Sequence, residues 1–189
     1  MTKKIWLSSP HMGGTEMTYV KQAYDSNWVA PLGPNVIAFE TALEKYLSND
    51  VKVACLSSGT SAIHLALILA GVKKDDEVLC QSFTFSASAS PIIYQGAKPI
   101  FIDSEINTWN ICPLALENAI KDRIYKGKKP KAIIMVHLYG MPAQIDKISE
   151  IARKYKIKLI EDAAEALGAT YKGQKCGSFG DFGILSLLT

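Results

Sequence analysis

Short apolar runs alternate with stretches of helical periodicity along this chain, and this alternation constrains the fold more than any other feature. Strands are expected where apolar and β-branched residues cluster, at residues 51–57, 77–81, 98–103, 131–137 and 157–162. Helices are expected after Thr15, from about Val36 to Leu47 with Asn35 as the cap, and at residues 61–71 and 145–156. Strands alternating with helices favour an α/β fold with a mostly parallel sheet, sandwiched by helices. No linker divides residues 1–189, so we expect one domain.

Composition and charge exclude several classes of partner. Hydrophobic residues make up 48% of the chain and charged residues 21%, as in soluble globular proteins. The net charge is only +3, and the densest basic run, residues 126–131, is expected to be a solvated loop. We therefore expect no nucleic-acid partner. Because the sequence shows neither a signal peptide nor a membrane-length apolar run, we expect a cytoplasmic protein with no membrane partner.

The cysteines and histidines lack the spacing of metal ligands. The four cysteines form no C-x-x-C motif and are expected to be reduced thiols: Cys55, Cys80, Cys112 and Cys176. The three histidines form no helical i,i+4 pair: His11, His64 and His137. We expect no metal site, and His64 and His137 are interpreted as structural.

Ligands of open α/β sheets bind outside the carboxyl ends of the strands, and a Ser-Ser-Gly-Thr-Ser run at residues 57–61 follows the first expected strand. Glycine permits close approach, and the free N–H groups of a helix start can bind an anion such as phosphate. An ordinary helix N-cap explains the run equally simply, and on its own is the better interpretation. The run matches neither a P-loop nor G-x-G-x-x-G.

Two further strand ends carry aromatic or acidic residues. Phe83 and Phe85 follow the strand at 77–81, where one ring could cover a flat ligand, or both could belong to the core. Glu161 and Asp162 end the strand at 157–162, where a buried carboxylate needs a cation or hydrogen-bond donors. Such a carboxylate could cap the next helix or pair with a protonated ring nitrogen. Together, a phosphate site, an aromatic side chain and a carboxylate suit pyridoxal phosphate.

Seven stretches of the chain resemble one family, the DegT/DnrJ/EryC1/StrS sugar-nucleotide aminotransferases within the fold-type-I pyridoxal-phosphate enzymes. They follow the family's order over nearly the whole chain: "LSSPHMGGTE", "NWVAPLGPNVIAFE", "LSSGTSAIHLAL", "QSFTFSASASPI", "GAKPIFID", "VHLYGMPAQID" and "LIEDAAEALGATYKGQKCGSFGDFGILS". The first two look most like the branch that makes UDP-bacillosamine or GDP-perosamine. The resemblance implies the amino-terminal part of the family's cofactor-binding large domain, here incomplete.

The resemblance also implies which residues hold the cofactor phosphate. By position, Thr60 and Ser61 next to Gly59 would bind the phosphate, and Ser186 would help from the other side.

The residues around the cofactor ring are implied in the same way. Phe85 would stack on the pyridine ring, and Asp162 would pair with its nitrogen. Glu165 stands where many members have Gln or His near the ring hydroxyl, and a carboxylate there would repel the phenolate unless it were protonated.

The activity that the resemblance implies is transfer of an amino group from an amino acid, commonly glutamate, to a 4-keto-6-deoxy sugar nucleotide. Trp28, Val29 and Ala30 would belong to the sugar-nucleotide entrance. The parent enzyme would be a cytoplasmic homodimer that serves the synthesis of surface polysaccharide or glycan.

In this family the motif continues past the position of Ser186 to the lysine that forms the Schiff base with the cofactor. The sequence departs from that pattern at Leu187, so we assign no catalytic residue and expect a truncated chain that is inactive alone. Lys172 and Lys175, in an expected hairpin around Gly173, are not expected to substitute. Two alternatives stay open: a sugar dehydratase of the same fold, with histidine in place of that lysine, or a non-catalytic remnant that binds cofactor or a full-length partner.

Overall fold

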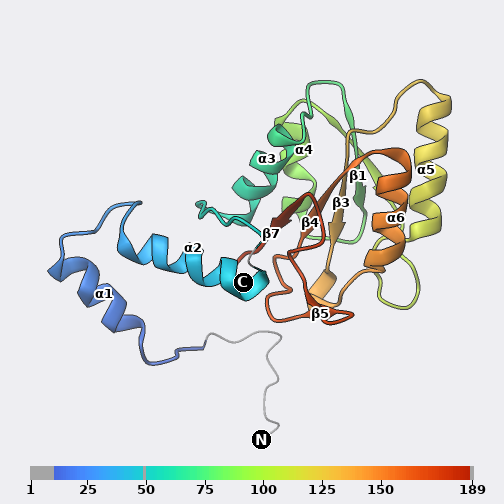
Figure 1. Cartoon of the computed structure of the whole chain (residues 1–189). Coiled ribbons are helices and arrows are strands. Elements are labelled where there is room, and N and C mark those ends of the chain that lie inside the picture. The colour runs from blue at the N-terminus through green and yellow to red at the C-terminus, as the bar shows by residue number, and fades with distance from the viewer. Residues whose placement is uncertain (1–10, 49, 188–189) are drawn as a thin grey trace, which may run out of the picture. The chain divides into compact units, whose positions relative to one another are not determined.

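The computed structural model describes residues 11–48 and 50–187, which form two compact units (Figure 1). The first unit ends at Cys55 and the second begins at Leu56. In the described part of the chain, no helix combines the length and the apolar composition that crossing a membrane requires.

The first unit contains the helices α1 (Glu16–Asp25) and α2 (Pro34–Leu47), close to the expected ranges. The prediction of Asn35 as the cap of α2 is wrong, because Gly33 occupies that position. Pro34 follows as the first helical residue, where its missing N–H costs no hydrogen bond. Asn35 instead donates from Nδ2 to the backbone oxygen of Tyr19 over 3.3 Å.

The strand expected at residues 51–57 is also absent from the described structure. The N–H groups of Val53 and Cys55 donate to the carboxylates of Glu44 and Glu40 on α2, over 3.2 and 2.8 Å, rather than to a neighbouring strand. A strand exists only through its pairing, and composition alone does not supply the partner.

The second unit is built on a five-stranded parallel sheet with the order β2-β1-β3-β4-β7. Its strands are β1 (Glu77–Gln81), β2 (Lys98–Ile102), β3 (Ala132–Val136), β4 (Lys158–Asp162) and β7 (Phe182–Ile184). The remaining four expected strands and the mostly parallel sheet are therefore confirmed. The carboxyl ends of β1, β3, β4 and β7 lie side by side at one edge, where the site is expected.

Helices cover both faces of this sheet (Figure 1). On one face lie α3 (Gly59–Leu69), α4 (Ser90–Tyr94) and the short turn η1 (Ser86–Ser88), and on the other lie α5 (Pro113–Tyr125) and α6 (Ile145–Tyr155). Successive side chains of a strand point to opposite faces of the sheet, so alternate residues pack in two separate hydrophobic cores. Ile134 and Ile160 pack in the core beneath α3, whereas Ile133 and Leu159 pack in the core beneath α5 and α6.

The expected hairpin is confirmed as β5 (Thr170–Tyr171) paired antiparallel with β6 (Gln174–Lys175). Lys172 and Gly173 form its turn with positive φ angles of 49° and 84°, the conformation that favours glycine. A second short turn, η2 (Leu138–Gly140), follows β3.

Candidate cofactor site

The amino-terminal end of α3 gathers hydroxyl groups. The Oγ of Ser58 accepts a hydrogen bond from the N–H of Ser61 over 3.1 Å, so Ser58 is a true N-cap. The Oγ of Ser61 lies 2.9 Å from that of Ser58 and 3.2 Å from that of Ser57. Thr60 is the second residue of the helix and is half-buried. Capping and anion binding are compatible here, since one side chain satisfies only one of the free N–H groups.

Ser186, which follows β7, meets this helix start. A Cβ placed on Gly59 would lie 3.2 Å from the Cβ and 3.4 Å from the Oγ of Ser186. A side chain at position 59 would therefore require Ser186 to shift by a few tenths of an ångström. The structure thus brings together the four residues expected around a phosphate: Gly59, Thr60, Ser61 and Ser186.

Asp162 ends β4 with its side chain only 5% exposed. Its Oδ2 accepts a hydrogen bond from Ser88 Oγ over 2.7 Å, and its Oδ1 accepts one from the N–H of Ala164 over 3.2 Å. Burial raises the pKa of this carboxyl, and the two hydrogen bonds offset that only in part. A buried anion of this kind is stabilised when a cation binds beside it.

Ser88 is a site residue that the sequence reasoning missed. Its hydroxyl lies between Thr84 Oγ1, at 2.8 Å, and the carboxylate of Asp162. The signal was present in the serine-rich run after β1, but a hydroxyl there has no evident partner until β1 and β4 are placed in one sheet.

Neither aromatic residue after β1 belongs to the core. Phe83 is 45% exposed and packs edge-to-face on Trp109, with ring centroids 6.0 Å apart. Phe85 is 79% exposed and directly precedes η1, where its backbone oxygen accepts from the N–H of Ser88. The ring of Phe85 is therefore exposed, in the loop that also carries Ser88.

Glu165 has a contact that the sequence did not predict. Its Oε2 accepts from the N–H of Tyr139 over 2.7 Å, in the η2 turn where Tyr139 has a φ of 51°. A Cβ on Gly140 would lie 2.9 Å from the backbone oxygen of Glu165, so the two segments touch. The charge of Glu165 also contributes to the raised pKa of Asp162.

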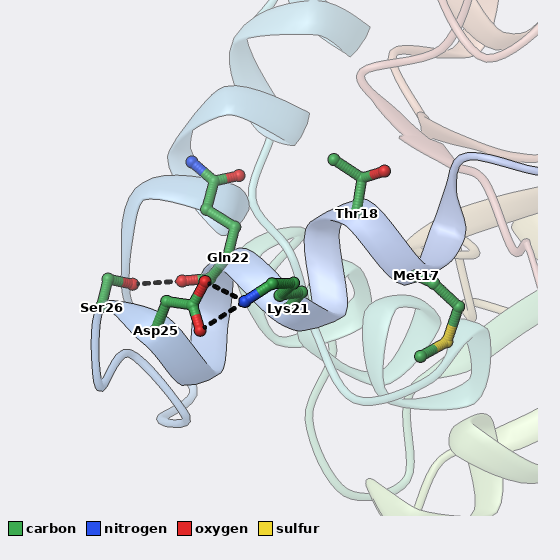
Figure 2. Close-up of a pocket in the computed structure, with 6 residues that line it drawn as sticks. All are labelled: Met17, Thr18, Lys21, Gln22, Asp25 and Ser26. Atoms are coloured by element: carbon green, nitrogen blue, oxygen red, sulfur yellow. Dashed lines mark hydrogen bonds and ion pairs between the residues drawn. The ribbon is translucent and has the colours of Figure 1, made fainter.

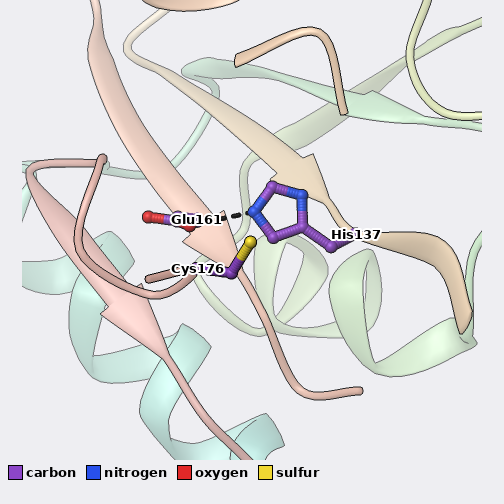
Figure 3. A group of neighbouring side chains, drawn as sticks. All are labelled: His137, Glu161 and Cys176. Carbon is purple, nitrogen blue, oxygen red and sulfur yellow. Dashed lines mark hydrogen bonds and ion pairs between the residues drawn. The ribbon is translucent and has the colours of Figure 1, made fainter. Parts of the chain in front are cut away.

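Three buried groups on the other face of the sheet, His137, Glu161 and Cys176, lie close enough to suggest a metal centre (Figure 3). Their hydrogen bonds argue for a structural network instead. His137 Nε2 lies 2.9 Å from Glu161 Oε1, and His137 Nδ1 accepts from the N–H of Ala143 over 3.2 Å. Burial, followed by the charge of Glu161, raises the pKa of the Cys176 thiol to about 11.

Trp28, Val29 and Ala30 lie between α1 and α2 in the first unit, with Trp28 and Val29 exposed. In the same unit a hollow runs along α1, lined by Met17, Thr18, Lys21, Gln22, Asp25 and Ser26 (Figure 2). An ion pair of 2.7 Å joins Lys21 to Asp25 within it. All the lining residues belong to α1 or its cap, so the hollow lacks the convergent groups from several elements that mark a ligand site.

One lysine of the hairpin, Lys172, forms an ion pair. Lys172 Nζ pairs with Asp146 Oδ2 over 2.8 Å, at the start of α6. The hydrogen bonds from Lys172 and Tyr171 lower the pKa of Asp146 and hold its carboxylate charged.

The model of the DegT/DnrJ/EryC1/StrS aminotransferase family matches residues 10–188. The chain is 53% identical over 186 residues to a Bacillus subtilis (strain 168) protein named "Putative pyridoxal phosphate-dependent aminotransferase EpsN", covering 98% of this chain and 48% of that one. It is 40% identical to the GDP-perosamine synthase of Caulobacter vibrioides, covering 97% and 47%.

Solved structures agree with the fold. A DegT DnrJ EryC1 StrS aminotransferase from Brucella abortus superposes with a TM-score of 0.79 at 32% identity, covering 90% of this chain and 48% of that one. The E. coli GDP-4-keto-6-deoxy-D-mannose-3-dehydratase with bound hydrated pyridoxal phosphate superposes with a TM-score of 0.81 at 29% identity, covering 92% and 44%. The chain spans about half the length of the relatives it matches.

Proposed function

The chain belongs to the DegT/DnrJ/EryC1/StrS aminotransferase family, and from this premise we propose that it forms the amino-terminal part of the cofactor-binding domain of a sugar-nucleotide aminotransferase. The reaction moves an amino group from an amino acid, with glutamate as the expected donor, to a 4-keto-6-deoxy sugar nucleotide. The names of relatives such as GDP-perosamine synthase support this substrate class. The observation that carries the proposal is the buried carboxylate of Asp162, held by Ser88 beside the start of α3.

Pyridoxal phosphate suits the residues gathered at this edge. The N–H groups at the start of α3 and the hydroxyls of Thr60, Ser61 and Ser186 form a site for the phosphate, aided by the positive end of the helix dipole. Because Ser186 approaches Gly59 closely, donors from two elements would surround one small anion bound there. This feature distinguishes the arrangement from a helix N-cap alone.

Asp162 holds a proton on the ring nitrogen. A buried carboxylate with a raised pKa gains most from a cation at short range, and a protonated pyridine nitrogen supplies that charge. Bound pyridoxal phosphate supplies an electron sink, whose strength depends on this protonation. Ser88 and Ala164 orient the carboxylate through their hydrogen bonds.

The remaining assignments are part of the same proposal. Phe85, exposed beside Ser88, covers one face of the ring. Glu165, engaged with the N–H of Tyr139, orients the η2 turn rather than contacting the ring hydroxyl. Trp28, Val29 and Ala30 contribute to the sugar-nucleotide entrance, and the full enzyme acts as a homodimer.

Pyridoxamine phosphate is a suitable probe of this site in the 189-residue chain, because it has no aldehyde to react with surface lysines. Equilibrium dialysis is expected to show saturable binding, and pyridoxamine without the phosphate is expected to bind at least about tenfold more weakly. Ser61→Ala should weaken binding of the phosphate form only. Ser149→Ala is the matched control, because Ser149 lies on α6, on the face of the sheet opposite to α3. Equal affinity for the two probes, or no binding, would contradict the proposal.

Sugar dehydration is the second candidate, favoured by the superposition on the E. coli dehydratase. The two reactions leave different products, an amino sugar or a sugar that has lost a further hydroxyl. Purified protein that carries this segment, given ¹⁵N-glutamate and a 4-keto-6-deoxy sugar nucleotide, distinguishes them by mass spectrometry of the product. Incorporation of ¹⁵N supports amino transfer, and loss of a hydroxyl without ¹⁵N supports dehydration.

A further inference from the structure

Glu161 is a fully buried carboxylate on β4 whose side chain faces away from that of Asp162, its neighbour in the strand. Its Oε1 lies 2.9 Å from His137 Nε2 and accepts from the N–H of Gly177 over 2.6 Å. Its Oε2 accepts from the N–H groups of Phe179 and Gly180 over 2.7 and 3.1 Å. Three backbone N–H groups of the loop at residues 177–180 thus donate hydrogen bonds to this one carboxylate, as in the nests of N–H groups that bind anions.

That loop is pressed against the sheet at two glycines. A Cβ on Gly180 would lie 2.8 Å from the backbone oxygen of Leu159 in β4. A Cβ on Gly183 in β7 would collide with the backbone oxygen of Gly177. The loop is therefore closely packed between its contact with Glu161 and β7.

The strand that leaves this loop carries Ser186. β7 pairs with β4 in the register Glu161↔Gly183 and Asp162↔Ile184, and the N–H of Ala163 donates to the backbone oxygen of Ile184 over 2.9 Å. Beyond Ile184 the chain reaches Ser186, which touches Gly59 at the start of α3. The loop that is hydrogen-bonded to Glu161 thus leads into a segment whose far end forms one side of the candidate phosphate site.

We propose that Glu161 is a positioning residue, which fixes the loop 177–180 and β7 so that Ser186 meets the start of α3 and completes the site for a phosphate monoester. This inference rests on the proposed function, because it takes the group between Ser186 and α3 to be the cofactor phosphate. It assigns Glu161 no contact with the cofactor, since its side chain lies on the opposite face of β4 from Asp162.

A double-mutant cycle in the 189-residue chain tests this coupling, with pyridoxamine phosphate as the ligand. Ser186→Ala is expected to lower the affinity by about 2- to 10-fold, the range of one hydrogen bond. Glu161→Gln is expected to lower it by a similar factor. The double variant should then bind no more weakly than the weaker of the two single variants, because Glu161 acts through Ser186. Fully additive losses would overturn the inference.

Glu77→Gln is the matched control. Glu77 is also a buried carboxylate, 3% exposed, and it pairs with Arg123 over 2.5 Å at the opposite, amino-terminal end of β1. This variant should lower the melting temperature without changing the affinity for pyridoxamine phosphate. An equal loss of affinity in Glu77→Gln would overturn the inference, because general destabilisation would then explain the effect of Glu161→Gln.

Hydrogen exchange of the wild-type chain decides the matter if Glu161→Gln does not fold. Pyridoxamine phosphate should slow exchange at the N–H groups of Gly177, Phe179 and Gly180, although none of them touches the ligand. Binding that leaves their exchange unchanged would overturn the inference and leave the proposed function intact. Failure of the wild-type chain to bind the ligand at all would overturn both.

Discussion

Ser88 donates a hydrogen bond to Oδ2 of Asp162 over 2.7 Å, and this contact joins the loop after β1 to the carboxyl end of β4. It fixes the orientation of a carboxylate that is only 5% exposed. The contact lies between elements far apart in sequence, so it exists only once the parallel sheet has formed.

Asp162→Asn should weaken the binding of pyridoxamine phosphate without lowering the stability of the fold. Burial raises the pKa of Asp162 above its usual value, so ionisation opposes folding at neutral pH, and this penalty disappears as the pH falls through the folded pKa. The neutral asparagine should therefore leave the melting temperature at pH 7 equal to or above that of the wild type. Affinity for pyridoxamine phosphate should fall by about 10- to 100-fold, the range of a hydrogen bond to a charged group. A lower melting temperature with unchanged affinity would contradict both roles.

Gly59→Ala should damage the phosphate site with little cost to the helix. The new Cβ would lie 3.2 Å from Ser186 Cβ, so Ser186 must move away from α3. We expect weaker binding of pyridoxamine phosphate in dialysis and a nearly unchanged thermal transition. Ser58→Ala is the comparison, because loss of the N-cap costs about 1 kcal/mol of stability without crowding Ser186. Full affinity in Gly59→Ala would show that Ser186 does not contribute.

Phe85→Ala should cost binding but not stability. The ring is 79% exposed, so its removal leaves no cavity, whereas loss of stacking on a flat ring is worth about 0.5–1.5 kcal/mol. Calorimetric titration with pyridoxamine phosphate measures the loss. Phe83→Ala serves as the control, since its ring packs on Trp109 instead. Equal loss of affinity in both variants would argue against a specific role for Phe85.

Acid should destabilise the chain in part through Glu161. Burial alone would raise the pKa of this carboxyl, but hydrogen bonds from His137 and the N–H groups of Gly177 and Phe179 outweigh it, and the net effect lowers the pKa. Because the pKa is lower in the folded state, the ionised carboxylate stabilises the fold at pH values above the unfolded pKa, which is near 4.5. This stabilisation is lost as the pH falls through the folded pKa. Urea unfolding from pH 6 to 3 should show a steeper loss in the wild type than in Glu161→Gln. Parallel pH profiles would contradict this.

Much of the second unit was predictable, because buried parallel strands and their helices leave a strong pattern in apolar residues. The strands at 77–81 and 158–162 fall where their sequences indicate. Residues 51–57 read equally well as a strand, but their N–H groups at Val53 and Cys55 bond to glutamates of α2. The composition of a segment indicates which side chains suit a strand, but it does not indicate which neighbouring strand would pair with it.

The site was predictable to a lesser degree. The resemblance singled out Thr60, Ser61 and Asp162, and the structure adds Ser88 as the donor to Asp162. Glu165 illustrates the limit, because its hydrogen bond to Tyr139 depends on a left-handed turn that no periodicity indicates. Contacts between loops follow from the sheet order and the turn geometry, and neither can be read from residue types.

The ¹⁵N chemical shift of the ring nitrogen in bound, ring-labelled pyridoxamine phosphate tests the central claim most directly. At a pH where the free nitrogen is unprotonated, the account predicts the shift of a protonated nitrogen in the wild-type chain. It predicts the unprotonated shift in Asp162→Asn that has been saturated with ligand. An unprotonated nitrogen in the wild type, or a protonated one in both chains, would contradict the pairing of Asp162 with the cofactor ring.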